Sequence, residues 1–293
     1  MAAIPVASGE QRAAGRAAER GLASMAPRRF LTIPAAVVGA GLIVILVLAA
    51  VFAPLLTPYD YAEIAPLEAY APPSREHLMG TDKFGRDVFT RVLYGGRISL
   101  TVGLIAIAIG ASIGVSVGLA AGYFGGLIDE ASMRVLDILL AFPGILLAMG
   151  VVAMLGPDLR NLMIAVGIGY IAGFARLMRG NVLAARTFDY VLAAEAIGGR
   201  AGTIMGRHIL PNIAAPLIVY TTLSVASAIL TAAGLSFLGL GAKPPSPEWG
   251  IMLSDGRETL NRAWWVSLFP GLAILVTTLS INFVVDGLRI ALD

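Results

Sequence analysis

The stretch ISLTVGLIAIAIGASIGVSVGLAAG, residues 98–122, contains no charged residue. A bilayer core of about 30 Å takes about 20 apolar residues in a helix, because each residue rises about 1.5 Å. Backbone amides left unpaired in lipid cost several kcal/mol each, so a segment of this length and composition crosses the membrane as a helix. Residues 98–122 therefore predict one transmembrane helix.

Five more apolar runs of spanning length occur along the chain. They cover residues 33–56, 131–155, 161–180, 213–240 and 264–289. The composition agrees, because only 14% of the residues are charged, whereas soluble domains carry about 25%. The sequence thus predicts an all-α, polytopic membrane protein with about six transmembrane helices.

The charges between these runs predict which side of the membrane each part faces. Residues 1–30 contain five arginines, and five more lie in or just before the polar loop 181–212, namely Arg176, Arg179, Arg186, Arg200 and Arg207. Short basic segments next to spans stay in the cytoplasm. An even number of spans places both termini on that side. The expected order is a cytoplasmic tail (1–30), a first transmembrane helix (31–56), an extracytoplasmic loop (57–97) and a membrane core (98–293) containing loop 181–212.

Several classes of function lack the residues that they need. The chain has no cysteine, which excludes disulfides and thiolate metal sites. A phosphate-binding P-loop ends in Lys-Ser or Lys-Thr, but Lys83 precedes phenylalanine and Lys243 precedes proline. The two histidines, His77 and His208, fall on opposite predicted sides, and neither is placed to act as the base of a serine nucleophile. We therefore expect no catalytic site, no metal site and no cofactor in this chain.

We attribute the small excess of basic residues to membrane topology. The formal net charge of +2 is spread over several loops rather than gathered on one face. We therefore expect the lipid bilayer, and no nucleic acid, as a partner.

The polar loop from residue 189 to 212 reads DYVLAAEAIGGRAGTIMGRHILPN. Asp189 is placed to cap a short helix, and Ala193 and Ala194 allow another backbone to approach closely. Gly198 is expected to end this helix through a positive φ, and Gly199 to tolerate a side chain more readily. The pattern alone is also typical of an ordinary interfacial amphipathic segment.

The same loop resembles the signature loop of ATP-binding-cassette (ABC) importer permeases. That signature reads E-A-A, three residues, G, nine residues, I-x-L-P. Ala193 and Ala194 match its two alanines, and Gly198 matches its glycine. Leu210 and Pro211 match the closing pair.

Two positions depart from the general signature, with Leu192 at the glutamate and His208 at the isoleucine. The form A-A-x-A-x-G with a closing R-H-x-L-P-N nevertheless resembles the peptide and nickel subgroup. In such permeases this loop docks into a groove of the ATPase subunit. The resemblance implies an ATPase-coupling loop whose expected residues are Asp189, Ala193, Ala194, Gly198, Gly199, Arg207, His208, Leu210 and Pro211.

Two longer stretches resemble the same subgroup, namely MGTDKFGRDVFTRVLYGGRISL (79–100) and LSFLGLGAKPPSPEWGIMLSDGR (235–257). Together the three matches imply a type I ABC importer permease-like fold, in the second membrane subunit of a dipeptide, oligopeptide or nickel importer. The implied partners are a second related permease, two ATPase subunits or domains that hold ATP and magnesium, and an extracytoplasmic solute-binding protein or lipoprotein. The implied location is the bacterial cell (inner or plasma) membrane, with both termini in the cytoplasm.

Two alternatives come from other classes of protein. An ion-coupled secondary transporter needs protonatable or ion-coordinating groups near the bilayer midplane, and the charge-poor spans argue against it. A polytopic membrane enzyme needs a catalytic constellation, which the sequence does not show.

The sequence also allows predictions for a few single residues. Asp137 is expected to pair with Arg134 one turn away or to face a neighbouring helix, with a role in lining the pathway as the alternative. Asp286 is expected to be interfacial. The three tryptophans, Trp249, Trp264 and Trp265, are expected to anchor the chain at the membrane surface, with contact to a delivering protein as the alternative for Trp249.

Overall fold

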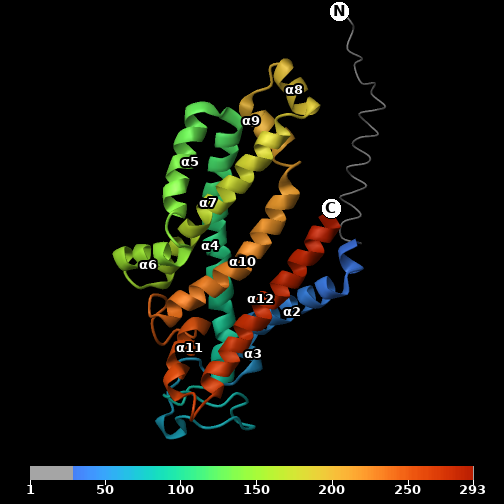
Figure 1. Ribbon diagram of the computed structural model, residues 1–293. Coiled ribbons are helices and arrows are strands. Elements are labelled where there is room, and N and C mark those ends of the chain that lie inside the picture. Colours follow the sequence, from blue (N-terminus) through green and yellow to red (C-terminus); the bar gives the residue numbers. More distant parts are fainter. Residues whose placement is uncertain (1–28, 293) are drawn as a thin grey trace, which may run out of the picture.

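The computed structural model describes residues 29–292, and every regular element there is helical (Figure 1). The expected cytoplasmic tail, residues 1–30, lies almost wholly outside these residues. The longer helices are α2 (Pro34–Val51), α4 (Val88–Phe124), α5 (Gly126–Leu140), α6 (Gly144–Leu155), α7 (Leu159–Ala185), α10 (Ala214–Phe237) and α12 (Trp265–Leu292). The shorter ones are α3 (Ala53–Leu56), η1 (Pro66–Glu68), α8 (Asp189–Ala196), α9 (Ala201–Thr203), η2 (Ile204–Ile209), α11 (Trp249–Gly256) and η3 (Arg257–Thr259).

Five of these helices are long and apolar enough to cross a membrane: α2, α4, α7, α10 and α12. Helices α5 and α6 together pass the same test but meet at 89°, which makes a broken sixth span or a re-entrant segment. The prediction of an all-α polytopic membrane protein is therefore confirmed.

The third predicted span, residues 131–155, is not a single helix. Helix α5 ends at Leu140, and Pro143 stands immediately before α6. Proline has no N–H to donate and pushes the preceding residue, Phe142, away from helical geometry. The chain turns at this point instead of continuing straight.

Helix α4 begins ten residues before its predicted start at residue 98. The Asp87 side chain accepts a hydrogen bond from the Thr90 amide and caps the helix there. Arg97, in the third turn, does not interrupt the helix, because its guanidinium donates to the Val51 carbonyl at 2.7 Å. Residues 88–97 are therefore helix rather than loop.

Small residues bring the spans close together. A Cβ atom at Gly114 of α4 would lie 2.5 Å from the Ile171 carbonyl oxygen of α7, and one at Gly39 of α2 would lie 2.6 Å from the Ser280 oxygen of α12. Glycines at such crossings let helix backbones approach, which is how helices associate in lipid. The main apolar core lies between α4, α6, α7 and α10 and includes Val102, Ala106, Ile107, Val152, Leu162, Phe174 and Leu235.

The elongated molecule carries different structures at its two ends (Figure 1). Helices α8 and α9, with the turns that follow, form one end, which we call the α8 loop (residues 186–213). The opposite end, which we call the cap, is formed by residues 57–87 and by residues 241–263, which include α11. His208 lies in the first and His77 in the second, as the predicted opposite sides require.

Candidate functional site: the α8 loop and the cap

Helix α8 does not start as expected. Phe188 is its N-cap residue, and Asp189 is the first helical residue and makes no capping hydrogen bond. A carboxylate in the first turn is still stabilised by the positive end of the helix dipole. The predicted capping role of Asp189 is thus replaced by a weaker electrostatic one.

Helix α8 ends in a glycine turn. Gly198 has φ +78°, and its N–H donates to the Glu195 carbonyl at 2.9 Å. The Gly199 N–H donates to the Ala194 carbonyl at 3.0 Å, which completes a Schellman motif. The predicted positive φ of Gly198 is confirmed.

Gly199 is constrained for a different reason. A Cβ atom there would lie 2.6 Å from the Ala194 carbonyl oxygen, so the backbone of the turn would have to shift. The expected tolerance of Gly199 is therefore wrong. Gly202 is a tolerant glycine of this loop, because its φ is ordinary and a Cβ atom there meets nothing within 4 Å.

The α8 loop is anchored to the end of α7 by a separate apolar cluster. The buried members of this cluster are Met178, Val182, Ala185, Val191, Ala194, Ile204, Ile209 and Ile213. Ala194 therefore faces inward, whereas Ala193 is exposed. Because α8 and η2 both contribute to this core, the loop is joined to α7 as a packed unit rather than as a loose connection.

The loop exposes several large apolar side chains. Ile197 is 87% exposed, and Phe188, Tyr190 and Leu192 are exposed as well. Leu192 occupies the glutamate position of the signature, so an apolar side chain projects where that motif has a charge. Side chains of this size gathered in one exposed place commonly mark an interaction site.

The remaining predicted residues lie between the helices. Arg207 and Pro211 are exposed, and His208 and Leu210 are half-buried in and after the π-helical turn η2. The His208 carbonyl accepts from Asn212 Nδ2 at 2.6 Å. Pro211 lies just before α10, which starts at Ala214.

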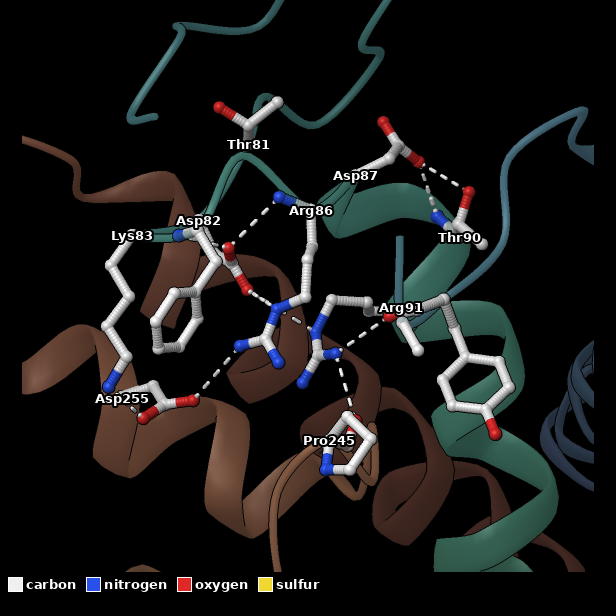
Figure 2. Close-up of polar contacts among 12 residues, drawn as sticks. Thr81, Asp82, Lys83, Arg86, Asp87, Thr90, Arg91, Pro245 and Asp255 are labelled. Carbon is white, nitrogen blue, oxygen red and sulfur yellow. Dashed lines mark hydrogen bonds and ion pairs between the residues drawn. The ribbon is translucent and has the colours of Figure 1, made fainter. Parts of the chain in front are cut away.

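The two long motif stretches, 79–100 and 235–257, meet in the cap (Figure 2). Arg86 Nε donates to Asp82 at 2.6 Å, and a guanidinium nitrogen of Arg86 lies 3.6 Å from Asp255. Arg91 is buried beside them and donates to the Tyr61 and Pro245 carbonyl oxygens at 2.9 and 3.1 Å. The charges of these motifs therefore hold the cap together.

Two tryptophans belong to the same unit. Trp249 Nε1 donates to the Val92 carbonyl and Trp265 Nε1 to the Thr81 carbonyl, both at 3.0 Å. Both rings are buried in one apolar cluster, and each indole N–H has a carbonyl acceptor, Val92 in α4 and Thr81 in the cap. The prediction of membrane-surface anchors is thus wrong for Trp249 and Trp265, while Trp264 is half exposed.

Glu248 was missed by the sequence-based prediction. Its buried carboxylate caps α11 by accepting from the amides of Gly250 and Ile251, both at 3.0 Å. Burial raises the pKa of the Glu248 carboxyl, although these amides act in the opposite direction. The signal in the sequence was a glutamate directly before a tryptophan that opens a helix.

Asp137 faces α7 and does not pair with Arg134. Its carboxylate accepts from Arg176 at 2.5 Å, whereas Arg134 pairs with Glu130 on its own helix. A second bridge between α5 and α7 joins Arg179 Nη2 to the Asp129 carboxylate at 2.6 Å. Of the two expectations for Asp137, the one that faces a neighbouring helix is confirmed. Asp286 is exposed on α12.

Comparison with known proteins gives the family. Residues 114–293 match the family model described as binding-protein-dependent transport system inner membrane component. Residues 21–73 match that of the N-terminal TM domain of oligopeptide transport permease C.

Two relatives match along most of their length. The dipeptide transport system permease protein DppC of Alkalihalophilus pseudofirmus is 50% identical over 258 residues, covering 88% of this chain and 85% of the relative. The glutathione transport system permease protein GsiD of Escherichia coli O1:K1 is 47% identical over 269 residues, covering 91% and 88%. The chain therefore belongs to the family of binding-protein-dependent transport system inner membrane components, and it is a multi-pass, non-catalytic permease subunit of an ABC importer.

Proposed function

We propose that this permease forms, with a second related permease, the pathway by which dipeptides or oligopeptides enter the cell. Both relatives described above are named for transport of peptides, a dipeptide and glutathione. An extracytoplasmic solute-binding protein or lipoprotein selects and delivers the peptide. Two ATPase subunits bind ATP and magnesium, and this chain holds neither.

The observation that carries the coupling role is the construction of the α8 loop. Its inner face is packed on α7, and its outer face presents Leu192 and Ile197 to the surroundings. A force applied to this outer face is transmitted to α7 because the two share one core. The coupling residues proposed here are those of the signature match, with the exposed apolar side chains of the loop as the contact surface.

The proposed orientation follows from the same assignment. The α8 loop lies at one end of the molecule and the cap at the other (Figure 1). ATPase subunits act in the cytoplasm, so the α8 loop lies there and the cap lies outside. With α5 and α6 counted as one broken span, the six spans place both termini in the cytoplasm as well. The arginines of the loop and of residues 1–30 support this orientation through the positive-inside rule.

Docking is tested by replacing one exposed isoleucine at each end. We expect Ile197→Ser to reduce recovery of the ATPase subunits in pull-downs of the detergent-solubilised importer, because an apolar contact of the loop is lost. Ile64→Ser is the matched control, because Ile64 is an exposed isoleucine of the cap. Equal recovery with both variants would show that the outer face of α8 is not the docking surface.

The substrate is tested with the complete importer, including its binding protein, in proteoliposomes. We expect ATP-dependent uptake of a labelled dipeptide, with competition by unlabelled dipeptides or oligopeptides. Nickel uptake without peptide uptake would favour the nickel alternative of the same family. Uptake driven by an ion gradient without ATP would favour a secondary transporter and overturn the proposal.

A further inference from the structure

His77 is a buried histidine in the cap with a carboxylate at each ring nitrogen. Nδ1 lies 2.9 Å from Asp87 Oδ1, and Nε2 lies 3.1 Å from Glu68 Oε2. The histidine is 6% exposed, and the ring of Tyr59 lies against it with centroids 5.0 Å apart. The hydroxyl of Tyr59 points away to the Glu76 carbonyl, to which it donates at 3.2 Å.

This geometry requires a charged imidazole. A neutral imidazole has one N–H donor and one acceptor nitrogen, whereas an ionised carboxylate only accepts. Neutral His77 would therefore turn a lone pair toward one of its two carboxylates. Only the imidazolium donates to both.

The energetics of the site agree with the geometry. Burial by itself lowers the pKa of His77, but the hydrogen bonds to Asp87 and Glu68 outweigh it and raise the pKa above its ordinary value of 6.5. The titratable or charged groups facing the imidazole are these two carboxylates and Tyr59. They belong to three different segments, since Glu68 lies in η1, Tyr59 precedes it and Asp87 caps α4.

The imidazolium connects the cap to the start of a transmembrane helix. The other oxygen of Asp87 accepts from the Thr90 amide at 2.7 Å and from the Thr90 hydroxyl at 2.6 Å. That hydroxyl in turn shares a 2.5 Å hydrogen bond with Thr57, at the beginning of the cap. His77, Asp87 and Thr90 thus form one chain of hydrogen bonds from η1 to α4.

We propose that His77 is a proton-operated latch, which holds the cap on the N-terminus of α4 while the imidazole is charged and releases it when the proton leaves. The direction of the pH dependence follows from the raised pKa of His77. The latch has its full strength below the free pKa of about 6.5 and loses it as the pH rises toward the pKa of the latched state. Within that window, release of one proton changes the equilibrium about tenfold per pH unit.

The latch is tested by the accessibility of a residue beneath the cap. Val88 is fully buried and packs in a cluster with Tyr70 and Met79 of the cap. The chain has no cysteine of its own, so Val88→Cys gives one thiol in the full chain, in nanodiscs. Its rate of labelling by a water-soluble thiol reagent is measured from pH 5.5 to 8.5. The same cysteine in a His77→Gln chain corrects for the pH dependence of the thiol itself.

We expect the labelling rate, relative to the His77→Gln chain, to be low at pH 5.5, to rise by up to about tenfold per pH unit above pH 6.5, and to approach equality at high pH. Glu68→Gln, which keeps a polar group at an exposed position, should shift this rise to lower pH. His208→Gln, at the other histidine of the chain, should leave it unchanged. A rate ratio independent of pH, or one that responds equally to His208→Gln, would overturn the latch.

A second readout does not depend on the cysteine. Amide hydrogen exchange of residues 57–90 should show loss of protection over the same pH range in the wild-type chain and not in the His77→Gln chain. Peptides from the α8 loop provide the reference for the intrinsic exchange rate. Equal protection changes in both chains would contradict the proposal.

Discussion

Lys83 and Asp255 are separated by 172 positions in the sequence, yet Lys83 Nζ donates to Asp255 Oδ1 at 2.7 Å. Asp255 also lies next to Arg86, so one carboxylate at the end of α11 connects to the segment that enters α4. The extended motifs before α4 and after α10 are thus two halves of one structure. Their charged residues serve the assembly of the cap, while the α8 loop carries the proposed coupling.

The first prediction concerns the buried charges of the cap. Asp82→Asn should lower stability by about 3–5 kcal/mol, because Arg86 and Arg91 would then be buried without their nearest carboxylate. Lys83→Gln is the control, and its partly exposed ion pair should contribute about 1 kcal/mol or less. Thermal unfolding followed by tryptophan fluorescence measures both, since Trp249 and Trp265 are buried in the cap. Similar melting temperatures for the two variants would contradict this account of the cap.

The second prediction concerns the approach of α11 to α4. A Cβ atom at Gly95 would lie 2.2 Å from the Pro247 carbonyl oxygen and 2.8 Å from the Trp249 ring. Gly95→Ala should therefore destabilise the cap by about 1–3 kcal/mol and change the fluorescence of Trp249. Gly150→Ala in α6 is the control, because a Cβ atom there meets nothing within 4 Å. An unchanged melting temperature for Gly95→Ala would show that the two segments are not packed this closely.

The third prediction concerns orientation in the membrane. Single cysteines at Arg200 in the α8 loop and at Ser74 in the cap are both placed at exposed positions. In intact cells, a membrane-impermeant thiol reagent should label Ser74→Cys and should reach Arg200→Cys only after the membrane is opened. Labelling of Arg200→Cys from outside would invert the proposed topology.

The spans were predictable because length and hydrophobicity decide them. Residues 33–56, 161–180, 213–240 and 264–289 overlap α2, α7, α10 and α12, with shifts at their ends. The bend between α5 and α6 also had a local signal in Pro143. The early start of α4 did not, because its arginines read as a polar loop until the carbonyls that accept from Arg91 and Arg97 are known.

The cap could not be predicted in the same way. Its contacts join residues such as Thr81 and Trp265, which lie 184 positions apart, and no local pattern gives their pairing. His77 illustrates the same limit, because spacing rules for metal sites do not reveal that Glu68 and Asp87 converge on its ring. The glycine turn of α8 was predictable at Gly198, where backbone conformation decides, but not at Gly199, where the position of the Ala194 carbonyl decides.

The coupling role of the α8 loop is tested most directly by assays of glycine variants in the reconstituted importer. A β-branched residue at φ +78° is strained by about 1–3 kcal/mol, so Gly198→Val should distort the contact surface without touching any span. We expect Gly198→Val and Gly199→Ala to reduce peptide uptake and substrate-stimulated ATP hydrolysis about tenfold, at unchanged abundance in the membrane. Gly202→Ala should retain both activities. Wild-type uptake with normal ATPase recovery in Gly198→Val would contradict the assignment of this loop to coupling.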